Sequence, residues 1–336
     1  MTDWRKAPTV AAGRTSVRGF TTALVLVAFA ATGCGVVRTN AGEPTVAPPA
    51  IRTELSRQVL ANYVTVNNKA NAKLDARLLA TYEGGSSRRI DVADYAWTKS
   101  QKGSYKSFHY TKPTFYIPRL TGYPRWFVVT ATSTGSKKPA PLLFQQQRAG
   151  GPWLQMYAVS LLPSVTLPEP ATTADGSLAV APPTGGTAAM TPKAVAKAYV
   201  TYLDGRRTAA AAAHRITPDA ATTSLISDDT RDITKLRSFA TTSVTYQVTA
   251  DPTYAVPTSD GGALVMFTML RTSSFVARPG ASLQVGASPF MASGNYQSIA
   301  QETVVQLAVR VPAKGKGNLA VLGQSQSVTS LVGSRY

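Results

Sequence analysis

Cysteine and histidine are nearly absent from this chain. Its 336 residues include one cysteine, Cys34, and two histidines, His109 and His214. One thiol cannot close an internal disulfide or build a multi-thiolate metal site. The two histidines lie in different halves of the sequence and lack the close spacing that puts two ligands on one element. The sequence therefore predicts no metal site, no cofactor and no catalytic centre made from cysteine and histidine.

Common nucleotide-binding and nucleophile motifs are missing as well. The sequence has no GxGxxG turn, no Walker phosphate loop and no GxSxG elbow. Carboxylates are sparse, and in the cluster Asp228, Asp229 and Asp232 the first and last residues fall on one helix face. This cluster could bind a cation. We favour another interpretation, in which Ser227 caps a helix and the acids stabilise its positive N-terminus. No catalytic residues, and no enzyme, are predicted.

A long hydrophobic run is absent after Cys34, so the sequence predicts no membrane-spanning helix there. Before Cys34, a positively charged segment is followed by a dozen mainly apolar residues, Phe20 to Ala31. This run is too short to cross a bilayer whose hydrocarbon core is about 30 Å thick. A charged start, a short apolar run and small residues after it are typical of a secretory signal peptide. We assign residues 1–33 to such a signal.

The small residues at the end of this signal lead directly into the cysteine. Ala31-Thr32-Gly33-Cys34 resembles the lipobox of bacterial lipoproteins, although that family usually has leucine where this chain has Ala31. The resemblance implies cleavage before Cys34, a diacylglyceryl group on its thiol, and anchorage at the outer face of the cytoplasmic membrane. Two acyl chains make a firm anchor, because each buried methylene contributes about 0.8 kcal/mol. A buried free cysteine is the alternative. Residues 34–50, rich in proline and alanine, follow as a flexible tether.

Basic residues outnumber acids: 35 lysines and arginines face 17 aspartates and glutamates, for a formal net charge of +18. Outside a cell membrane the available anions are lipid head groups and wall polymers, so we expect no nucleic-acid partner. Two interpretations stay open. The charge provides general solubility, or it forms a surface for an anionic polymer or lipid. The second gives a role to the basic residues at expected turns, which are Arg88, Arg89, Lys137, Lys138, Arg206, Arg207, Lys314 and Lys316.

Composition divides the chain into two parts. Residues 166–190 are rich in proline, glycine, alanine and threonine and lack periodicity, which indicates a linker. We therefore expect one domain at 51–165 and a second at 191–336. Both begin with apolar residues at helical spacing and continue with short apolar strands.

The same order of elements is expected in both domains. The expected helices cover 53–66, 72–82 and a short turn within 89–100 in the first domain, and begin at Pro192 and Ser227, with an alanine-rich helix between them, in the second. The expected strands cover 107–111, 114–119, 125–132, 141–147, 153–161, 243–249, 262–270, 302–311 and 318–328. The tetrapeptide NYVT at 62–65 matches AYVT at 198–201, which favours a duplication with an insertion at 273–299.

Helices followed by a meander of antiparallel strands define an α+β fold class. We predict two tandem similar domains, each with N-terminal helices packed on a curved antiparallel sheet. This layout is similar to the cystatin-like and nuclear-transport-factor-like folds, in which a curved sheet wraps a long helix. With its lipobox and its alanine-, threonine-, arginine- and valine-rich composition, the whole chain resembles the uncharacterised lipoproteins of actinomycetes. The resemblance carries no catalytic residues over.

Aromatic residues crowd the strand region of the first domain and alternate with basic residues there. Rings and cations together could line a groove that binds a polymer, with the rings stacking on sugar faces. The alternative, which we favour, is a sheet core with cross-strand aromatic pairs. The candidate surface consists of Tyr105, Tyr110, Tyr116, Trp126, Trp153, Lys106 and Arg125.

These observations predict an exported, lipid-anchored protein that binds or scaffolds without catalysis. Candidate partners are wall polymer, anionic lipid or another envelope protein. The alternative is a small-molecule carrier or enzyme whose cone-shaped pocket lies between the sheet and helix of one domain. A pocket lined by apolar groups with a few converging polar ones would favour that alternative, whereas a filled cone would favour the first hypothesis.

Overall fold

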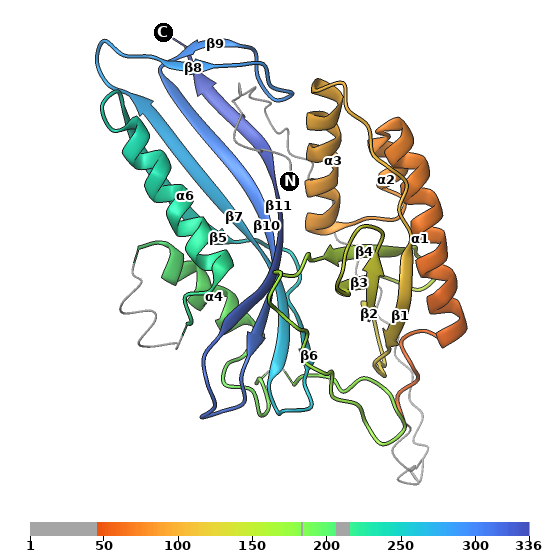
Figure 1. The fold of residues 1–336 in the computed structure, drawn as a ribbon. Helices are drawn as coiled ribbons and strands as arrows, with labels where there is room; N and C mark the ends of the chain where they lie inside the picture. Colours follow the sequence, from red (N-terminus) through yellow and green to blue (C-terminus); the bar gives the residue numbers. More distant parts are fainter. Residues whose placement is uncertain (1–45, 183, 206–215, 336) are drawn as a thin grey trace, which may run out of the picture.

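The computed structural model describes residues 46–182, 184–205 and 216–335. The predictions that fall outside these residues concern the signal peptide 1–33, the lipidated Cys34, most of the tether, Arg206, Arg207, His214 and the alanine-rich helix. The fold class is α+β, as the sequence predicts, because helices and antiparallel sheets occupy separate stretches of chain (Figure 1). We refer to residues 46–165 as the first half, 166–190 as the connecting segment and 191–335 as the second half.

The first half places its helices before a four-stranded sheet. The strands form an antiparallel meander in the order β1-β2-β3-β4 (Figure 1). The elements are α1 (Thr53–Lys73), α2 (Ala76–Leu79), α3 (Gly85–Ser100), β1 (Tyr110–Tyr116), β2 (Arg125–Ser133), β3 (Ala140–Gln146) and β4 (Trp153–Ala158).

Helix α3 is the main departure from expectation in the first half, since the sequence analysis expected only a short turn within 89–100. Its buried residues include Ser86, Ser87 and Ala93. Such small or polar residues do not form the apolar stripe by which an amphipathic helix is recognised. Both serines form hydrogen bonds to the second half. The helix is therefore supported by a surface from far along the chain, which local pattern does not reveal.

The helices and one face of the first sheet enclose a hydrophobic core. Phe127 and Phe144 are fully buried and stack with ring centroids 5.2 Å apart. Leu60 of α1 and Leu79 of α2 belong to the same core. Aromatic rings thus fill the space between sheet and helices.

The second half repeats the order of helices before strands on a larger scale. Its main sheet has the order β11-β10-β7-β5, with β6 paired to the end of β7, and β8 and β9 form a separate hairpin. The elements are α4 (Pro192–Leu203), α6 (Ala220–Leu236), β5 (Ala240–Val248), β6 (Tyr254–Pro257), β7 (Ala263–Ala277), β8 (Leu283–Val285), β9 (Gly294–Tyr296), β10 (Ser298–Val311) and β11 (Ala320–Ser334).

The two helix starts of the second half illustrate one confirmed expectation and one wrong one. Helix α4 begins at Pro192, and the Thr191 side chain accepts a hydrogen bond from the amide of Ala194, as the sequence predicts. Helix α6 begins earlier than expected, at Ala220. Its cap is Asp219, which accepts from the amide of Thr222 at 2.9 Å, so Ser227 lies inside the helix and caps nothing.

The stretch expected as an insertion, 273–299, is continuous with the main sheet at both ends. Strand β7 runs on to Ala277, and β10 already begins at Ser298, so these two strands pair over their full lengths. The part that leaves the sheet is the β8–β9 hairpin with its turns (Figure 1). The four strands of the first sheet are much shorter, and the duplication remains a prediction.

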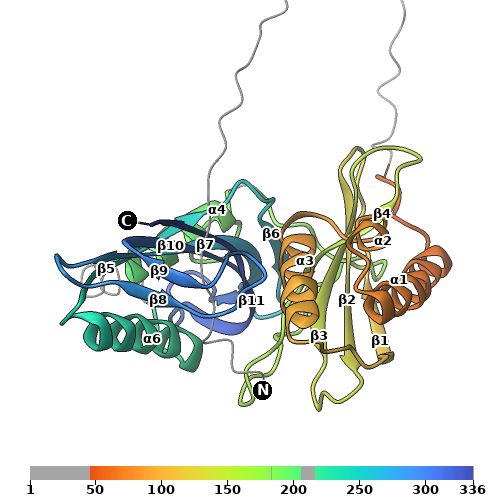
Figure 2. The same cartoon turned by 90° about the horizontal axis from the view of Figure 1, so that it is seen from above.

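The two halves share a core, because the second sheet is buried on both faces. Helices α4 and α6 cover one face, where Val265 and Phe267 point into the core of the second half. The first half covers the other face, where Leu264 and Met266 pack with Val128 of β2. Figure 2 shows the halves side by side, with the main sheet of the second half between α6 and α3.

In its described residues, 166–182 and 184–190, the connecting segment has no helix or strand and contacts both halves. Leu178 is only 2% exposed, and its amide donates to the carbonyl of Ile117. The amide of Ala189 donates to the carbonyl of Pro312. The segment is therefore packed along the joint between the halves. Whether it marks a domain boundary stays a prediction.

Candidate binding cavity

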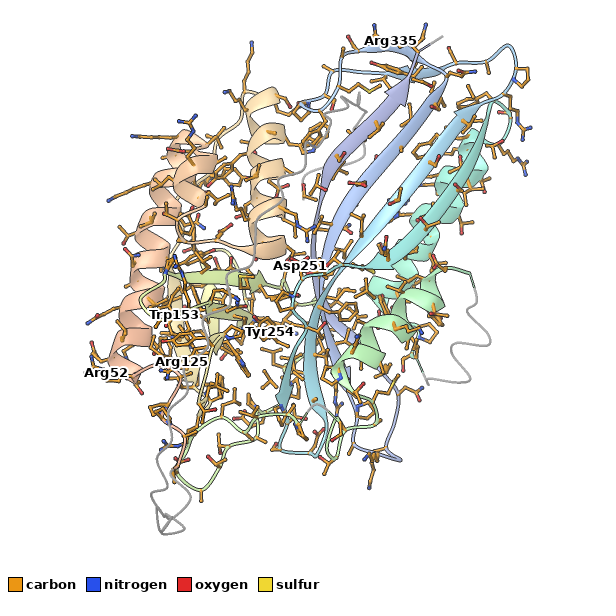
Figure 3. All side chains as sticks on the ribbon, turned by 180° about the vertical axis from the view of Figure 1, so that it is seen from behind. Arg52, Arg125, Trp153, Asp251, Tyr254 and Arg335 are labelled. Carbon is orange, nitrogen blue, oxygen red and sulfur yellow. The ribbon has the colours of Figure 1, made fainter. Side chains whose placement is uncertain are left out.

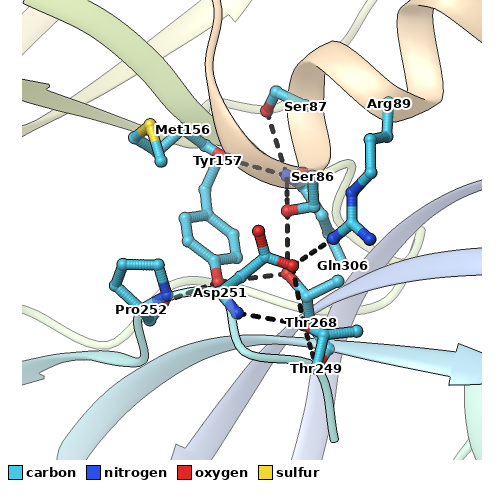
Figure 4. Close-up of polar contacts among 10 residues, drawn as sticks. All are labelled: Ser86, Ser87, Arg89, Met156, Tyr157, Thr249, Asp251, Pro252, Thr268 and Gln306. Atoms are coloured by element: carbon cyan, nitrogen blue, oxygen red, sulfur yellow. Dashed lines mark hydrogen bonds and ion pairs between the residues drawn. The ribbon is translucent and has the colours of Figure 1, made fainter. Parts of the chain in front are cut away.

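The side chain of Gln306 on β10 ties the first half to the second (Figure 4). Its Nε2 atom donates to the hydroxyl oxygens of Ser86 and Ser87, at 2.8 and 2.9 Å, and to the carbonyl of Met156 at 2.8 Å. Its Oε1 atom accepts from the amide of Ala158 at 3.2 Å. Gln306 is 1% exposed, so these bonds form away from water. Both the nitrogen and the oxygen of this one side-chain amide therefore form hydrogen bonds across the joint.

Local structure explains why the first half offers these partners. The pairing register of β3 and β4 skips Met156, which is the mark of a β-bulge. The carbonyl of this residue accepts from Gln306 across the joint. A buried carbonyl needs such a partner, since leaving it without one costs about 1–3 kcal/mol.

Further polar contacts surround this glutamine. Thr268 on β7 shares a 2.7 Å hydrogen bond with Ser86 and donates to the hydroxyl of Tyr157 at 3.1 Å. At the edge of the joint, Arg89 forms an ion pair with Asp251 (Figure 4). Residues of α3 and β4 are thereby fixed against β7 and β10.

A cavity of about 340 Å³ lies along this joint and takes its walls from both halves. Helix α3 and strand β4 supply one wall, and β10 and β11 supply the opposite one. The lining residues are Tyr63, Ser87, Ile90, Asp91, Asp94, Gln155, Ala158, Ser160, Gln306, Gln324, Ser325 and Gln326. Most of them carry amide, hydroxyl or carboxyl groups, so the cavity is polar.

Two carboxyl groups on α3 face the cavity. Asp91 and Asp94 are three residues apart, a spacing that puts them on one side of the helix. Burial raises the pKa of Asp91 to about 7, and the neighbouring Asp94 adds to the shift. Burial also raises the pKa of Asp94 to about 6, although a 2.5 Å hydrogen bond from the hydroxyl of Ser327 opposes that shift. Both groups therefore titrate near neutral pH.

A third carboxyl, Glu83, lies behind these two in the first half. Its Oε1 atom accepts from the hydroxyl of Tyr63 and from the amide nitrogen of Asn67, each at 3.2 Å. Burial and the nearby Asp91 hold the pKa of Glu83 well above its usual value, and the two carboxyl groups interact by a hydrogen bond. Two carboxyl groups can form such a bond only if one of them keeps its proton.

Several buried polar atoms around the cavity have no hydrogen-bond partner within the described residues. They include Nε2 of Gln155 and Oε1 of Gln324. Gln155 is 1% exposed, and its backbone is held on both sides, by the carbonyl of Tyr82 and the amide of Gly84. Its side chain is therefore a positioned donor that lines the cavity without a protein acceptor.

The cavity is acidic although the protein is strongly basic. None of the residues that line it is lysine, arginine or histidine. Within the described part of the chain, no group of three or more histidine, cysteine, aspartate or glutamate residues could hold a metal ion. The arrangement thus offers oriented amide and hydroxyl groups together with carboxylates, a set suited to binding a polar molecule.

Comparison with protein families matches residues 47–332 to a family described as a domain of unknown function (DUF8094). The chain belongs to this family. The match runs through the first half, the connecting segment and the second half. The unit that defines the family therefore includes the joint and its cavity.

Individual relatives agree with the resemblance that the sequence suggests. An uncharacterised lipoprotein of Streptomyces coelicolor is 29% identical over 320 residues, covering 91% of this chain and 92% of the relative. An uncharacterised lipoprotein of Streptomyces avermitilis is 28% identical over 333 residues, covering 90% of each chain. A second one from S. coelicolor is 34% identical over 142 residues, or 40% of each chain. No solved structure matches. The similarity to uncharacterised actinomycete lipoproteins is thus confirmed.

In this member of the DUF8094 family, the residues of the expected aromatic and basic surface lie on different sides of the first sheet. Trp153 packs into the helix-facing core, 5.1 Å from the ring of Phe127, and Tyr110 borders the same core. Tyr105 is 38% exposed and Lys106 is exposed, both on the loop after α3. Figure 3 labels Trp153 and Arg125 in the first half.

Two further members of that set, Trp126 and Tyr116, face the joint. Trp126 contacts the ring of Tyr254 at 5.7 Å between centroids, and Tyr116 borders the core that the halves share. Arg125 lies over the ring of Tyr123 and is half-buried. The seven residues are therefore not brought onto one surface, and their role in polymer binding stays a prediction.

The acidic residues of the cluster on α6 form ion pairs with arginines. Arg271 of β7 donates from Nε and Nη2 to Oδ1 of Asp229, at 2.9 and 2.6 Å, and both residues are buried. Asp228 pairs with Arg231 at 2.5 Å, and Arg231 also lies 3.8 Å from Asp232. One carboxylate thus attaches α6 to the sheet, and the other two form ion pairs within α6.

Among the described residues, no helix is long and apolar enough to cross a membrane.

Proposed function

We propose that the protein is an exported, lipid-anchored envelope protein, held at the outer face of the cytoplasmic membrane by Cys34, which binds its partner without catalysis. Two facts support the anchor. The chain has a lipobox at Ala31-Thr32-Gly33-Cys34, and relatives that match about nine-tenths of it are named lipoproteins. The expected signal peptide, 1–33, and most of the expected tether, 34–50, precede the family match, which begins at residue 47.

The observation that carries the binding role is the polar cavity between the halves. Its walls come from two parts of the chain that a network of buried hydrogen bonds holds together. A site with fixed walls binds with less loss of conformational freedom than a site that must be ordered first. The cavity lies between the halves, whereas the alternative places its pocket between the sheet and helix of one half; there, Phe127 and Phe267 are buried in the two cores.

Replacement of Cys34 by alanine should abolish lipid attachment. The thiol is the acceptor of the lipid, and alanine offers no nucleophile. In cells fed a labelled fatty acid, the Cys34→Ala protein should carry no label and should leave the membrane fraction or remain unprocessed. Thr39→Ala, in the same tether, is the matched control and should behave as the parent. Label and membrane association that survive in Cys34→Ala would overturn the proposed anchor.

A second candidate role, binding of anionic wall polymer or anionic lipid at the surface, is favoured by the net charge of +18. Of the basic residues singled out in the sequence, Arg88, Arg89, Lys137, Lys314 and Lys316 are exposed. Arg88 and Arg89 lie in α3 rather than in a turn, and Arg89 is paired with Asp251. The turn between β10 and β11 therefore offers two exposed lysines, Lys314 and Lys316, for contact with an anionic surface.

Electrostatic binding of this kind should weaken steeply as salt increases. The Debye length falls from about 30 Å at 0.01 M to about 10 Å at 0.1 M, which screens exposed charges. Sedimentation of the Cys34→Ala protein with purified wall or anionic vesicles measures this without the lipid. Lys314→Glu with Lys316→Glu should reduce binding further while stability changes by less than about 0.5 kcal/mol. Binding that does not respond to salt would leave the charge with a role in solubility only.

A further inference from the structure

We infer that the cavity between the halves binds a small polyhydroxylated organic cation, a molecule with one ammonium group on a body rich in hydroxyls. The inference rests on the proposed binding function and names the class of ligand for that site. Three features carry it: the unpartnered polar atoms, the carboxyl groups without basic partners, and the size of the cavity.

The unpartnered atoms call for hydroxyl groups. Nε2 of the buried Gln155 is a donor and Oε1 of Gln324 is an acceptor, and both residues line the cavity. A hydroxyl both donates and accepts, so a polyol can satisfy atoms of either kind. Ser160 and Ser325 add hydroxyls to the same wall. A buried donor without an acceptor costs free energy, and a ligand that supplies the acceptor recovers it.

The carboxyl groups call for a cation. Asp91 and Asp94 line the cavity, Glu83 lies behind them, and no lysine, arginine or histidine is among the lining residues. Carboxylates buried without a cation are unfavourable, and an ammonium group placed between them offsets that cost. Without residues 1–33, which hold four basic residues and one acid, the net charge falls from +18 to +15, so the protein as a whole disfavours cations and the acidic cavity is a local exception.

The size of the cavity suits a molecule of about the length of a hexose. A volume of about 340 Å³ lies at the lower end of the range for small-molecule sites, which is roughly 300–1,000 Å³. A single metal ion would leave most of this space unfilled, and the described residues offer no group of three or more ligands for one.

Protonation of the carboxyl groups competes with the cation. The titratable groups near Asp91 are Asp94 and Glu83, with the hydroxyls of Tyr63, Tyr82, Tyr95, Tyr105 and Tyr110 around them. With pKa values of about 7 and about 6, Asp91 and Asp94 are mostly neutral at pH 5 and mostly ionised at pH 8. Binding of a cation should therefore strengthen as the pH rises through this window.

The test uses N-methylglucamine and sorbitol, two polyols of similar length of which only the first carries an ammonium group. The full-length lipoprotein in detergent micelles is titrated with each by calorimetry at about pH 5 and pH 8. N-methylglucamine should bind at pH 8 and at least about tenfold more weakly at pH 5, because protons compete for the carboxylates. Sorbitol should bind at least about tenfold more weakly than N-methylglucamine at pH 8.

Three variants connect the result to the cavity. Asp91→Asn and Gln155→Leu should each weaken N-methylglucamine at pH 8 by about tenfold or more. Neither should destabilise the protein, because one removes a half-buried charge and the other an unpartnered donor. Glu54→Gln, an equal change of charge on exposed α1, is the control and should have no effect.

Equal binding of the two polyols, or binding that Asp91→Asn leaves unchanged, would overturn the inference of a cationic ligand. Binding of neither polyol would overturn it as well. These outcomes are independent of the anchor, because the proposed envelope location fails only if Cys34→Ala keeps its lipid and its membrane association.

Discussion

Replacement of Arg271 by methionine should destabilise the second half by about 3–5 kcal/mol, because it leaves a buried carboxylate without its cation. Arg271 and Asp229 are each 5% exposed, and two hydrogen bonds from the guanidinium end on Oδ1 of Asp229. The other oxygen, Oδ2, accepts from the hydroxyl of Tyr246 at 2.7 Å. Methionine replaces the unbranched apolar stem of arginine but ends before the guanidinium and supplies no donor. Urea denaturation, followed by fluorescence, measures the change.

The chain contains a matched control for this pair. Arg310 on the neighbouring strand lies 2.6 Å from Asp260, the same separation as between Arg271 and Asp229. The side chains of Arg310 and Asp260 are, however, each more than two-fifths exposed. Exposed ion pairs contribute about 0–1 kcal/mol, so Arg310→Met should change stability little. The double variant Arg271→Met with Asp229→Leu should recover much of the loss, since it removes both charges. Equal effects of Arg271→Met and Arg310→Met would contradict the argument.

This buried pair also shows where sequence reasoning stops. The acids of α6 were visible as a cluster, and an interpretation without metal was favoured for them. The partner of Asp229 is not evident from the sequence, because Arg271 lies 42 residues further on in a strand that is otherwise uncharged. Only the register of β7 beneath α6 brings the two together, and no local pattern encodes that register.

The elements that the sequence predicts well are those that bury an apolar stripe within their own half. Helix α4 follows from Thr191, Pro192 and the spacing of its buried residues Val195 and Tyr199. Strands β7 and β10 follow from their long apolar runs. Each of these patterns reflects a core formed by neighbouring parts of the chain, so the local sequence contains enough information.

The cavity was not predicted, because its walls are made by docking of the two halves. Gln155 and Gln306 look like polar residues on the solvent side of alternating strands, yet both are 1% exposed. The sequence of α3 is more polar than that of a typical buried helix, because its buried serines form hydrogen bonds across the same joint. Polar residues that face another part of the same chain cannot be distinguished by pattern from residues that face water.

The joint itself should come apart when Gln306 is replaced by leucine. Leucine fills similar space but leaves the carbonyl of Met156, the amide of Ala158 and two serine hydroxyls without this partner. Each buried group that loses its hydrogen bond costs about 1–3 kcal/mol. Ser86 keeps its bond to Thr268, so three groups lose a partner and we expect a loss of at least about 3 kcal/mol at the joint. The halves should then separate more often, and protease should gain access to the connecting segment, 166–190, whose Leu178 is buried between them.

Limited proteolysis under native conditions distinguishes this outcome from general unfolding. Gln306→Leu should be cut first within 166–190 and yield two fragments that resist further digestion, because each half keeps its own core. The control Gln247→Leu, on exposed β5 of the same sheet, should be cut no faster than the parent. Degradation of Gln306→Leu without stable fragments would mean that neither half holds its fold without the other. The hydrogen bonds of one glutamine would then support the whole family domain, in agreement with a family match that spans both halves.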